Sequence, residues 1–324
     1  CVLRNNGGYG IQFAPTAAGR ALTVTNCSIN ANGSYGIRTL ASSAGTVSVT
    51  SSIITNHSAY GVARSDASTV TTSFSDVWNN TSGNFLGGSQ SNVIASNPLY
   101  VSATNLRLTS NSPARFGAMG GGDQGALPYL TDATPGLHGT LWVNTTLALP
   151  SSPYTVAGDL VVAPNVTLTI PAGVTLSFTT TDLMAAGLDT GRAELQVAGT
   201  LVADAPPASP INLTAASPSP GAWYGLEFLA SATGAVVDNL VVSYPVRGLN
   251  LAATGANALS AITVQSASQY GLYASAGAPA VDGFVAISAA SIGAFVDAAG
   301  SLTLTNCVLR NNGGYGIQFA PTAA

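Results

Sequence analysis

The chain has 324 residues, of which 46% are hydrophobic and only 7% are charged. Ordinary soluble domains carry about 25% charged residues, so this composition is unusual. All nine cations are arginines and the net charge is −4, which gives no reason to expect nucleic acid as a partner. We expect no membrane span in this segment, because no apolar stretch reaches roughly 18 residues. A polar, nearly uncharged surface favours an extracellular or cell-surface location.

The same 18 residues, CVLRNNGGYGIQFAPTAA, occupy positions 1–18 and 307–324. A long identical segment at a fixed offset is typical of repeat architecture. The offset of 306 residues therefore indicates one full period plus an overlap, taken from a longer tandem array.

A smaller repeat runs through this large one. A three-residue motif, in which any residue is followed by Gly and then by an apolar residue, recurs at spacings of about 22–26 residues. We call this motif the Gly step. Its period is typical of solenoids, and its first example is Tyr9-Gly10-Ile11. It continues at Tyr35-Gly36-Ile37, Tyr60-Gly61-Val62, Tyr224-Gly225-Leu226, Arg247-Gly248-Leu249, Tyr270-Gly271-Leu272, Ile292-Gly293-Ala294 and Tyr315-Gly316-Ile317.

Alignment of these units on the Gly places apolar residues in columns. The alternation in Leu22-Thr23-Val24 is that of a strand, with one side chain inward and the next outward. Asn- and Gly-rich turns such as Asn5-Asn6-Gly7-Gly8 separate about three short strands in each unit. Such units, stacked in register as the rungs of a solenoid, predict an all-β parallel β-helix. The predicted interior columns are Leu22 with Val47 and Leu302, Val24 with Val49 and Leu304, Leu3 with Ile29, Ile54 and Val77, and Ile11 with Ile37, Val62 and Phe85.

Several segments resemble known proteins. The pattern from Leu302 to Ile317 resembles the repeat of right-handed parallel β-helix proteins of the pectate-lyase-like superfamily. Residues 160–176 and 195–203 look like the opening rungs of such domains in large tandem-repeat bacterial surface proteins, and 97–127 looks like their closing segment. The resemblance implies a right-handed β-helix and leaves the function open, since one fold hosts many activities.

The predicted modules are shifted relative to the numbering. Residues 1–128 are interpreted as the later rungs and closing segment of one module, and 129–324 as the capping, opening and central rungs of the next. A full module would hold about eleven rungs at this repeat length. We expect the closing segment and residues 129–145 to cap the seam, or to let neighbouring modules stack end to end.

Carboxylates are the first candidates for catalytic groups, because polysaccharide hydrolysis needs two of them about 5–9.5 Å apart. Asp76, Asp238, Asp282 and Asp297 are expected in different columns. The densest polar group, His57 with Arg64 and Asp66, is interpreted as a solvated rung edge. We therefore predict no catalytic residue, no cofactor and no metal site, with a polysaccharide lyase or hydrolase as the least favoured alternative.

Two further sets of residues have alternative interpretations. Cys27 and Cys1, whose copy is Cys307, fall in one column, where they would form a disulfide or stack as plain apolar residues. The tyrosines before the Gly, Tyr9, Tyr35, Tyr60 and Tyr270, would form a packing ladder or contact glycans.

The leading hypothesis from sequence is a non-catalytic structural module of an extracellular fibre, stalk or adhesin shaft, bacterial in origin. Its partners would be neighbouring copies end to end. The alternative is a glycan-binding adhesin module with polysaccharide as the partner.

Overall fold

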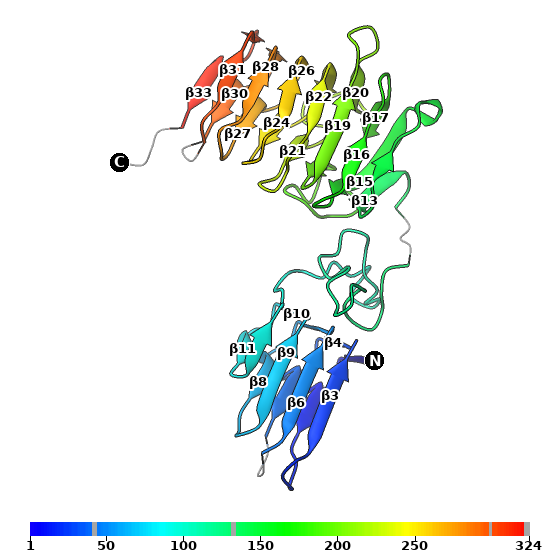
Figure 1. The fold of residues 1–324 in the computed structure, drawn as a ribbon, viewed down its shortest axis with the longest axis vertical. Coiled ribbons are helices and arrows are strands. Elements are labelled where there is room, and N and C mark those ends of the chain that lie inside the picture. The colour runs from blue at the N-terminus through cyan, green and yellow to red at the C-terminus, as the bar shows by residue number, and fades with distance from the viewer. Residues whose placement is uncertain (41–43, 131–133, 298–299, 321–324) are drawn as a thin grey trace. The chain divides into compact units, whose positions relative to one another are not determined.

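The computed structural model describes residues 1–40, 44–130, 134–297 and 300–320. The chain forms two compact units, Cys1–Asp132 (unit 1) and Ala133–Ala324 (unit 2). In both units short parallel strands stack in successive rungs (Figure 1).

Unit 1 contains three sheets of four parallel strands each. Each sheet takes one strand from each rung. The first sheet holds β1 (Val2–Arg4), β4 (Ser28–Asn30), β7 (Ile53–Thr55) and β10 (Asp76–Trp78). The second holds β2 (Ile11–Phe13), β5 (Ile37–Thr39), β8 (Tyr60–Arg64) and β11 (Gly83–Leu86), and the third β3 (Ala21–Thr25), β6 (Thr46–Thr50), β9 (Thr69–Ser73) and β12 (Ser89–Ser91).

Unit 2 also has three rows of parallel strands, two of which join through the long strand β15 (Tyr154–Val162). One row holds β17 (Thr175–Phe178), β20 (Ile211–Ala215), β23 (Leu240–Ser243), β26 (Ile262–Gln265), β29 (Val285–Ile287) and β32 (Val308–Arg310). The second holds β18 (Leu195–Val197), β21 (Leu226–Phe228), β24 (Arg247–Leu251), β27 (Tyr270–Ala274), β30 (Ile292–Val296) and β33 (Ile317–Phe319). The third holds β14 (Thr145–Thr146), β16 (Thr167–Thr169), β19 (Thr200–Asp204), β22 (Val236–Asp238), β25 (Ala258–Ser260), β28 (Ala280–Asp282) and β31 (Thr303–Thr305).

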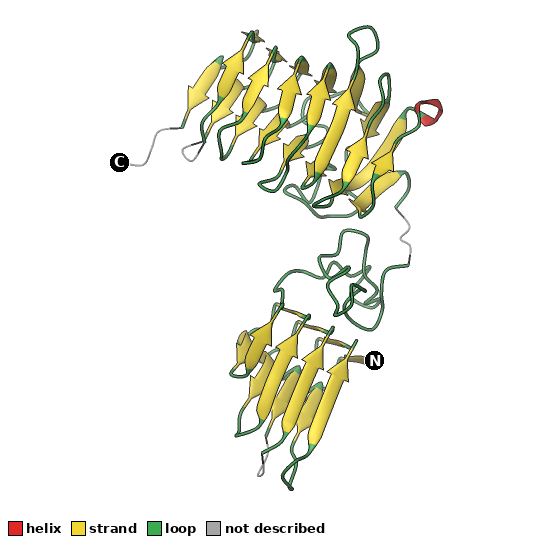
Figure 2. Ribbon diagram, in the orientation of Figure 1, coloured by secondary structure: helices red, strands yellow, loops and turns green. Residues whose placement is uncertain are grey.

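Unit 2 starts with β13 (Leu137–Leu141), which pairs with β15. Within the part of the chain that the structure describes, the one helical element is the short 3-10 turn η1 (Leu149–Ser151), red in Figure 2. The all-β parallel β-helix expected from the sequence is confirmed.

The predicted interior columns are confirmed as register partners in unit 1. Ile29 pairs with Leu3 on one side and with Ile54 on the other, and Ile54 pairs with Val77. The other three columns pair as predicted: Ile11–Ile37–Val62–Phe85, Leu22–Val47 and Val24–Val49. Ile29, Ile54 and Val77 are fully buried, so these stacked aliphatic side chains form the core of unit 1.

The register also shows where rungs depart from the expected length. Leu249 pairs with Leu226 on one side and with Leu272 on the other, so these rungs have equal lengths within the predicted range. Leu160 and Leu195 are also partners, but they lie much further apart in the sequence, because the segment 179–193 leaves the rung between them.

The recurrent Gly is required by the close approach of neighbouring rungs. A Cβ added to Gly10 would lie 2.6 Å from the carbonyl oxygen of Gly36, and one on Gly271 would lie 2.5 Å from that of Gly293. The same obstacle, the next glycine's carbonyl, faces an added Cβ on Gly36, Gly248 and Gly293. Only glycine leaves room for the backbone of the following rung at this position.

The segment that follows β12 packs against the outer face of the first sheet of unit 1. Ile94 adds a bridge to Asp76, and the segment then runs back over the sheet, where Leu108 and Ala114 cluster with Ile53. The amide of Ala126 donates a hydrogen bond to Ser28 Oγ (3.0 Å), and Arg4 donates to the Thr104 carbonyl (2.7 Å). The closing segment therefore covers a lateral face from the last rung of unit 1 to the first. Its expected role at a module seam stays a prediction, and residues 131–133 of that region lie outside the described residues.

Candidate functional site

Aromatic side chains gather on the outer surface of unit 2 around β27 and β30. The rings of Tyr270, Tyr273 and Phe295 stack on one another, with centroids 5.0–5.8 Å apart and planes within 14°. The Arg247 guanidinium lies 4.2 Å from the Tyr273 ring, a cation–π geometry. Tyr273 donates a hydrogen bond to Asp297 Oδ2 (2.5 Å). We refer to Arg247, Tyr270, Tyr273 and Phe295 as the aromatic cluster.

The aromatic cluster continues into a column of polar side chains on the same sheet. Glu227, Asn250, Tyr273 and Phe295 are successive register partners. Glu227 and Asn250 are each only 4% exposed, and Asn250 Oδ1 has no hydrogen-bond partner in the structure. Burial raises the pKa of Glu227, whereas its hydrogen bond from Gln196 and the nearby Arg247 lower it. Half-buried aromatic faces beside polar groups are suited to contacting sugar rings.

The tyrosines that the sequence singled out fall into two separate groups. Tyr9, Tyr35 and Tyr60 follow one another in unit 1, with centroid distances of 5.5 and 6.3 Å. Arg38 lies 4.7 Å from the Tyr35 ring and donates a hydrogen bond to the Tyr9 hydroxyl (3.0 Å). Tyr270 belongs to the aromatic cluster of unit 2. Ring stacking is therefore present in both groups, and the glycan contact stays a prediction.

The structure does not bring the polar group of His57, Arg64 and Asp66 together at a solvated edge. His57 is 1% exposed; its Nδ1 accepts from the Asn32 amide, and its Nε2 is 3.2 Å from the Ile29 carbonyl. Burial lowers the pKa of His57 to about 4, so the ring is neutral at pH 7. Asp66 accepts hydrogen bonds from Thr39 and the Ser68 amide instead. The interpretation of His57 as solvated was wrong, because the turn that carries it folds into the rung.

The expected separation of the aspartates into different columns was also wrong in one part. Asp204 pairs in register with Asp238, Ser260 donates to Asp238 (2.8 Å), and Ser260 pairs in turn with Asp282. Asp238 and Asp282 therefore share a column, with one rung between them. The Gly step defines positions in the second row of strands but not in the third, where these residues lie.

No sequence pattern indicates the buried pair of acids in unit 2. Asp159 and Glu194 are fully buried, and the Glu194 amide donates to Asp159 Oδ1 (3.0 Å). Gly187 lies against both carboxyl groups, and Glu194 Oε2 has no hydrogen-bond partner. Burial, and then the charge of neighbouring carboxylates, raises the pKa of Asp159 to about 8 and that of Glu194 to about 9. The excursion of residues 179–193 separates the two acids in the sequence.

Asp76 is the third fully buried carboxyl. Burial raises its pKa to about 7, and Oδ1 accepts from the Ser96 amide (3.2 Å). The closing segment covers Asp76, so the same packing that buries Ile53 also buries this acid. Among the described residues, no group of three or more His, Cys, Asp or Glu is arranged to hold a metal ion.

The three cysteines are free thiols in the structure. Cys1 Sγ and Cys27 Sγ lie 2.8 Å apart on neighbouring rungs, in the shared column that the sequence indicated. The disulfide remains a prediction.

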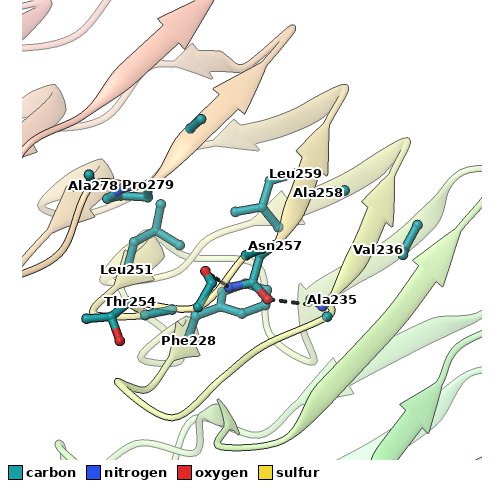
Figure 3. A pocket seen from close by; sticks show the side chains of 15 residues that line it. Phe228, Ala235, Val236, Leu251, Thr254, Asn257, Ala258, Leu259, Ala278 and Pro279 are labelled. Atoms are coloured by element: carbon teal, nitrogen blue, oxygen red, sulfur yellow. Dashed lines mark hydrogen bonds between the residues drawn. The ribbon is translucent and has the colours of Figure 1, made fainter.

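A cavity of about 550 Å³ opens where the turns before β25 and β28 leave the rung (Figure 3). Phe228, Leu251 and Leu259 supply its apolar wall. Asn257 is held by its own bonds, accepting from the Ala235 amide (3.0 Å) and donating to the Gly255 carbonyl (3.1 Å). Its lining contains no titratable side chain, so the cavity has no group for acid or base chemistry.

Comparison with known proteins identifies the fold family for part of the chain. Residues 1–112 match the family described as right handed beta helix region. No curated protein and no solved structure matches the chain. Together with this match, the parallel rungs of both units show the fold of a right-handed parallel β-helix. Among the described residues, no helix is long and apolar enough to cross a bilayer.

Proposed function

We propose that this chain is a structural module of a long extracellular fibre, stalk or adhesin shaft, made of tandem copies and without catalytic activity. The observation that carries the proposal is the identity of residues 1–18 with 307–324, a 306-residue period in a chain built of stacked rungs. Stacked units that contact only their neighbours extend in one direction, as a shaft requires.

The rigidity of such a shaft would come from strand pairing between rungs and from the packed interior. Parallel strands of neighbouring rungs pair along three rows, and fully buried aliphatic columns fill the interior. These acids do not favour an enzyme, since Asp159 and Glu194 are fully buried and Asp238 accepts hydrogen bonds from Ser260 and Asn239. A bacterial cell surface is the setting that the low charge and the sequence resemblance favour.

The mass of the native polypeptide, measured under denaturing and reducing conditions, tests the proposal. We expect many times the 32.2 kDa of this chain, because the repeats would be joined in one polypeptide. A native mass close to that of this chain alone would contradict a covalent tandem shaft.

A glycan-binding adhesin module is the second candidate, and the aromatic cluster favours it. Its three stacked rings lie beside Asn250, whose buried Oδ1 has no partner. The partly exposed faces of these rings suit stacking against the sugar rings of a polysaccharide.

A glycan array tests this second function. We expect saturable binding that is lost in Tyr273→Ala with Phe295→Ala. The matched control is Tyr35→Ala with Tyr60→Ala, which removes stacked rings from unit 1 instead. Loss only in the control would move the site to the tyrosines of unit 1, and flat binding by the wild-type chain would exclude this function.

A further inference from the structure

The duplicated segment forms a rung in each unit, and the two copies have opposite sides open. In unit 1, β1 and β2 are the first strands of their sheets and pair with β4 and β5. In unit 2, the identical strands β32 and β33 are the last of their rows and pair with β29 and β30. Each copy thus shows one half of the contacts that this rung can make.

The backbone hydrogen bonds of the two copies use different atoms. In unit 2 the carbonyl oxygens of Tyr315 and Gly316 accept from the amides of the preceding rung, at 2.9 and 2.8 Å. In unit 1 the amides of Gly10 and Ile11 donate to the carbonyls of the following rung, at 2.9 and 2.8 Å. Because Gly10 is the copy of Gly316, one rung can make both sets of bonds at once.

Steric space at the glycines is complementary as well. A Cβ on Gly10 would lie 2.6 Å from the Gly36 carbonyl oxygen, whereas one on Gly316 would have no atom within 4 Å. The reverse holds at the other glycine of the rung: Gly7 is open, and its copy Gly313 is blocked by the Ala290 carbonyl. The residue types in this rung suit contacts on both sides.

We propose that the edge formed by β31, β32 and β33 is the docking surface for a second copy of this sequence, the next repeat of the array. Residues 307–320 then take the place that 1–14 hold in unit 1, and the rungs continue without a break into the next repeat. One new strand pair forms, between β31 and β3. Addition of a strand to an open sheet edge is a common mode of recognition.

The pairing register of this new contact follows from the columns. Leu304 lies twelve residues before Gly316, as Val24 lies twelve before Gly36, so Leu304 faces Val24. By the same count Leu302 faces Leu22. Leu22, Leu302 and Leu304 are only partly buried in the structure, and Val24 is buried. The junction would therefore cover apolar surface that the two edges leave exposed. This inference rests on the proposed tandem function and specifies how repeats join.

A circular permutant tests the junction. It joins residues 133–324 directly to 19–132, so that it contains the repeat period once with a single copy of the duplicated rung. In the chain as it stands, we expect Gly316→Ala to leave the Tm unchanged and Gly10→Ala to lower it. In the permutant, Gly316→Ala should lower the Tm by several degrees, because the Cβ now meets the Gly36 carbonyl. Gly122→Ala, with no atom near the added Cβ, is the control expected to be silent in both.

Hydrogen exchange of the unsubstituted permutant provides a second readout. The amides of Gly316 and Ile317 should exchange more slowly than in the original chain, because they gain the carbonyls of Tyr35 and Gly36 as acceptors. Unchanged exchange, a silent Gly316→Ala in the permutant, or a permutant that does not fold cooperatively would each overturn the proposal. These results are independent of the native mass: a native mass of a single period would remove the tandem function, yet leave the permutant result as it is.

Discussion

At the scale of single residues, the recurrent glycine and the buried acids are positioned for different reasons. The glycine is required by the stacking of rungs, and the acids are brought together by an irregular segment. The recurrent Gly is set by the distance to the next rung, as the 2.6 Å approach of the Gly36 carbonyl to a Cβ on Gly10 shows. It could be recognised from the sequence because it repeats. The acids Asp159 and Glu194 do not repeat, and only folding of the 179–193 segment brings them together, so no sequence pattern indicates them.

The acid pair predicts that unit 2 loses stability as the pH rises. Asp159 and Glu194 have folded pKa values of about 8 and 9, above their ordinary values near 4. Between about pH 4 and 9 the folded state therefore binds more protons than the unfolded state, and the free energy of unfolding falls with rising pH. Asp182, Asp189 and Glu227 add negative charge to this site. We expect Asp159→Asn to raise stability at pH 8, on the order of 1–3 kcal/mol, and to reduce the pH dependence.

Thermal unfolding at pH 5 and pH 8 checks this prediction. The exposed Asp204 provides the control, since Asp204→Asn should leave the difference between the two pH values unchanged. A variant Asp159→Asn that is less stable than wild type at pH 8, with an unaltered pH dependence, would show that the carboxyl is stabilising when ionised.

At the scale of elements, the interior columns predicted from the sequence are confirmed as register partners in unit 1. They were predictable because the alternation within each strand and the regular spacing between rungs are both visible in the sequence. What the sequence could not show was the path of irregular segments. The closing segment lies over the first sheet through Leu108 and Ala114, which follow no rung period. The third row of strands was also misplaced relative to the Gly step, which led to the error for Asp238 and Asp282.

The columns predict a strong dependence on single aliphatic side chains. Ile54 is fully buried and has column partners on both sides, Ile29 and Val77. We expect Ile54→Ala to lower the free energy of unfolding by about 2–5 kcal/mol, since it leaves a cavity in the core of unit 1. Urea unfolding followed by circular dichroism measures the change.

Leu86→Ala is the matched control, because Leu86 is 40% exposed at the edge of the second sheet. Its loss should be less than about 1 kcal/mol. Equal effects of the two substitutions would mean that the column does not carry the stability of unit 1.

At the scale of the whole molecule, repetition is the property that explains most of the chain. Gly316 has open space at one edge of unit 2, and its copy Gly10 lies against the next rung in unit 1. The identity of the two end segments predicted a tandem array, and the complementary contacts add a physical way for its repeats to join. Which polymer or surface the array meets was not predictable, because outward side chains such as Glu227, Asn250 and Tyr273 follow no single chemistry.

The most direct test of the tandem shaft is limited trypsin digestion of the native polypeptide, followed by mass analysis under denaturing conditions. Cleavage follows only Arg in this sequence, which has no Lys, and the account predicts the same Arg sites in every repeat. The account predicts a ladder of large fragments whose masses differ by equal steps of one repeat period. A single parent band near the 32.2 kDa of this chain, without such steps, would contradict it.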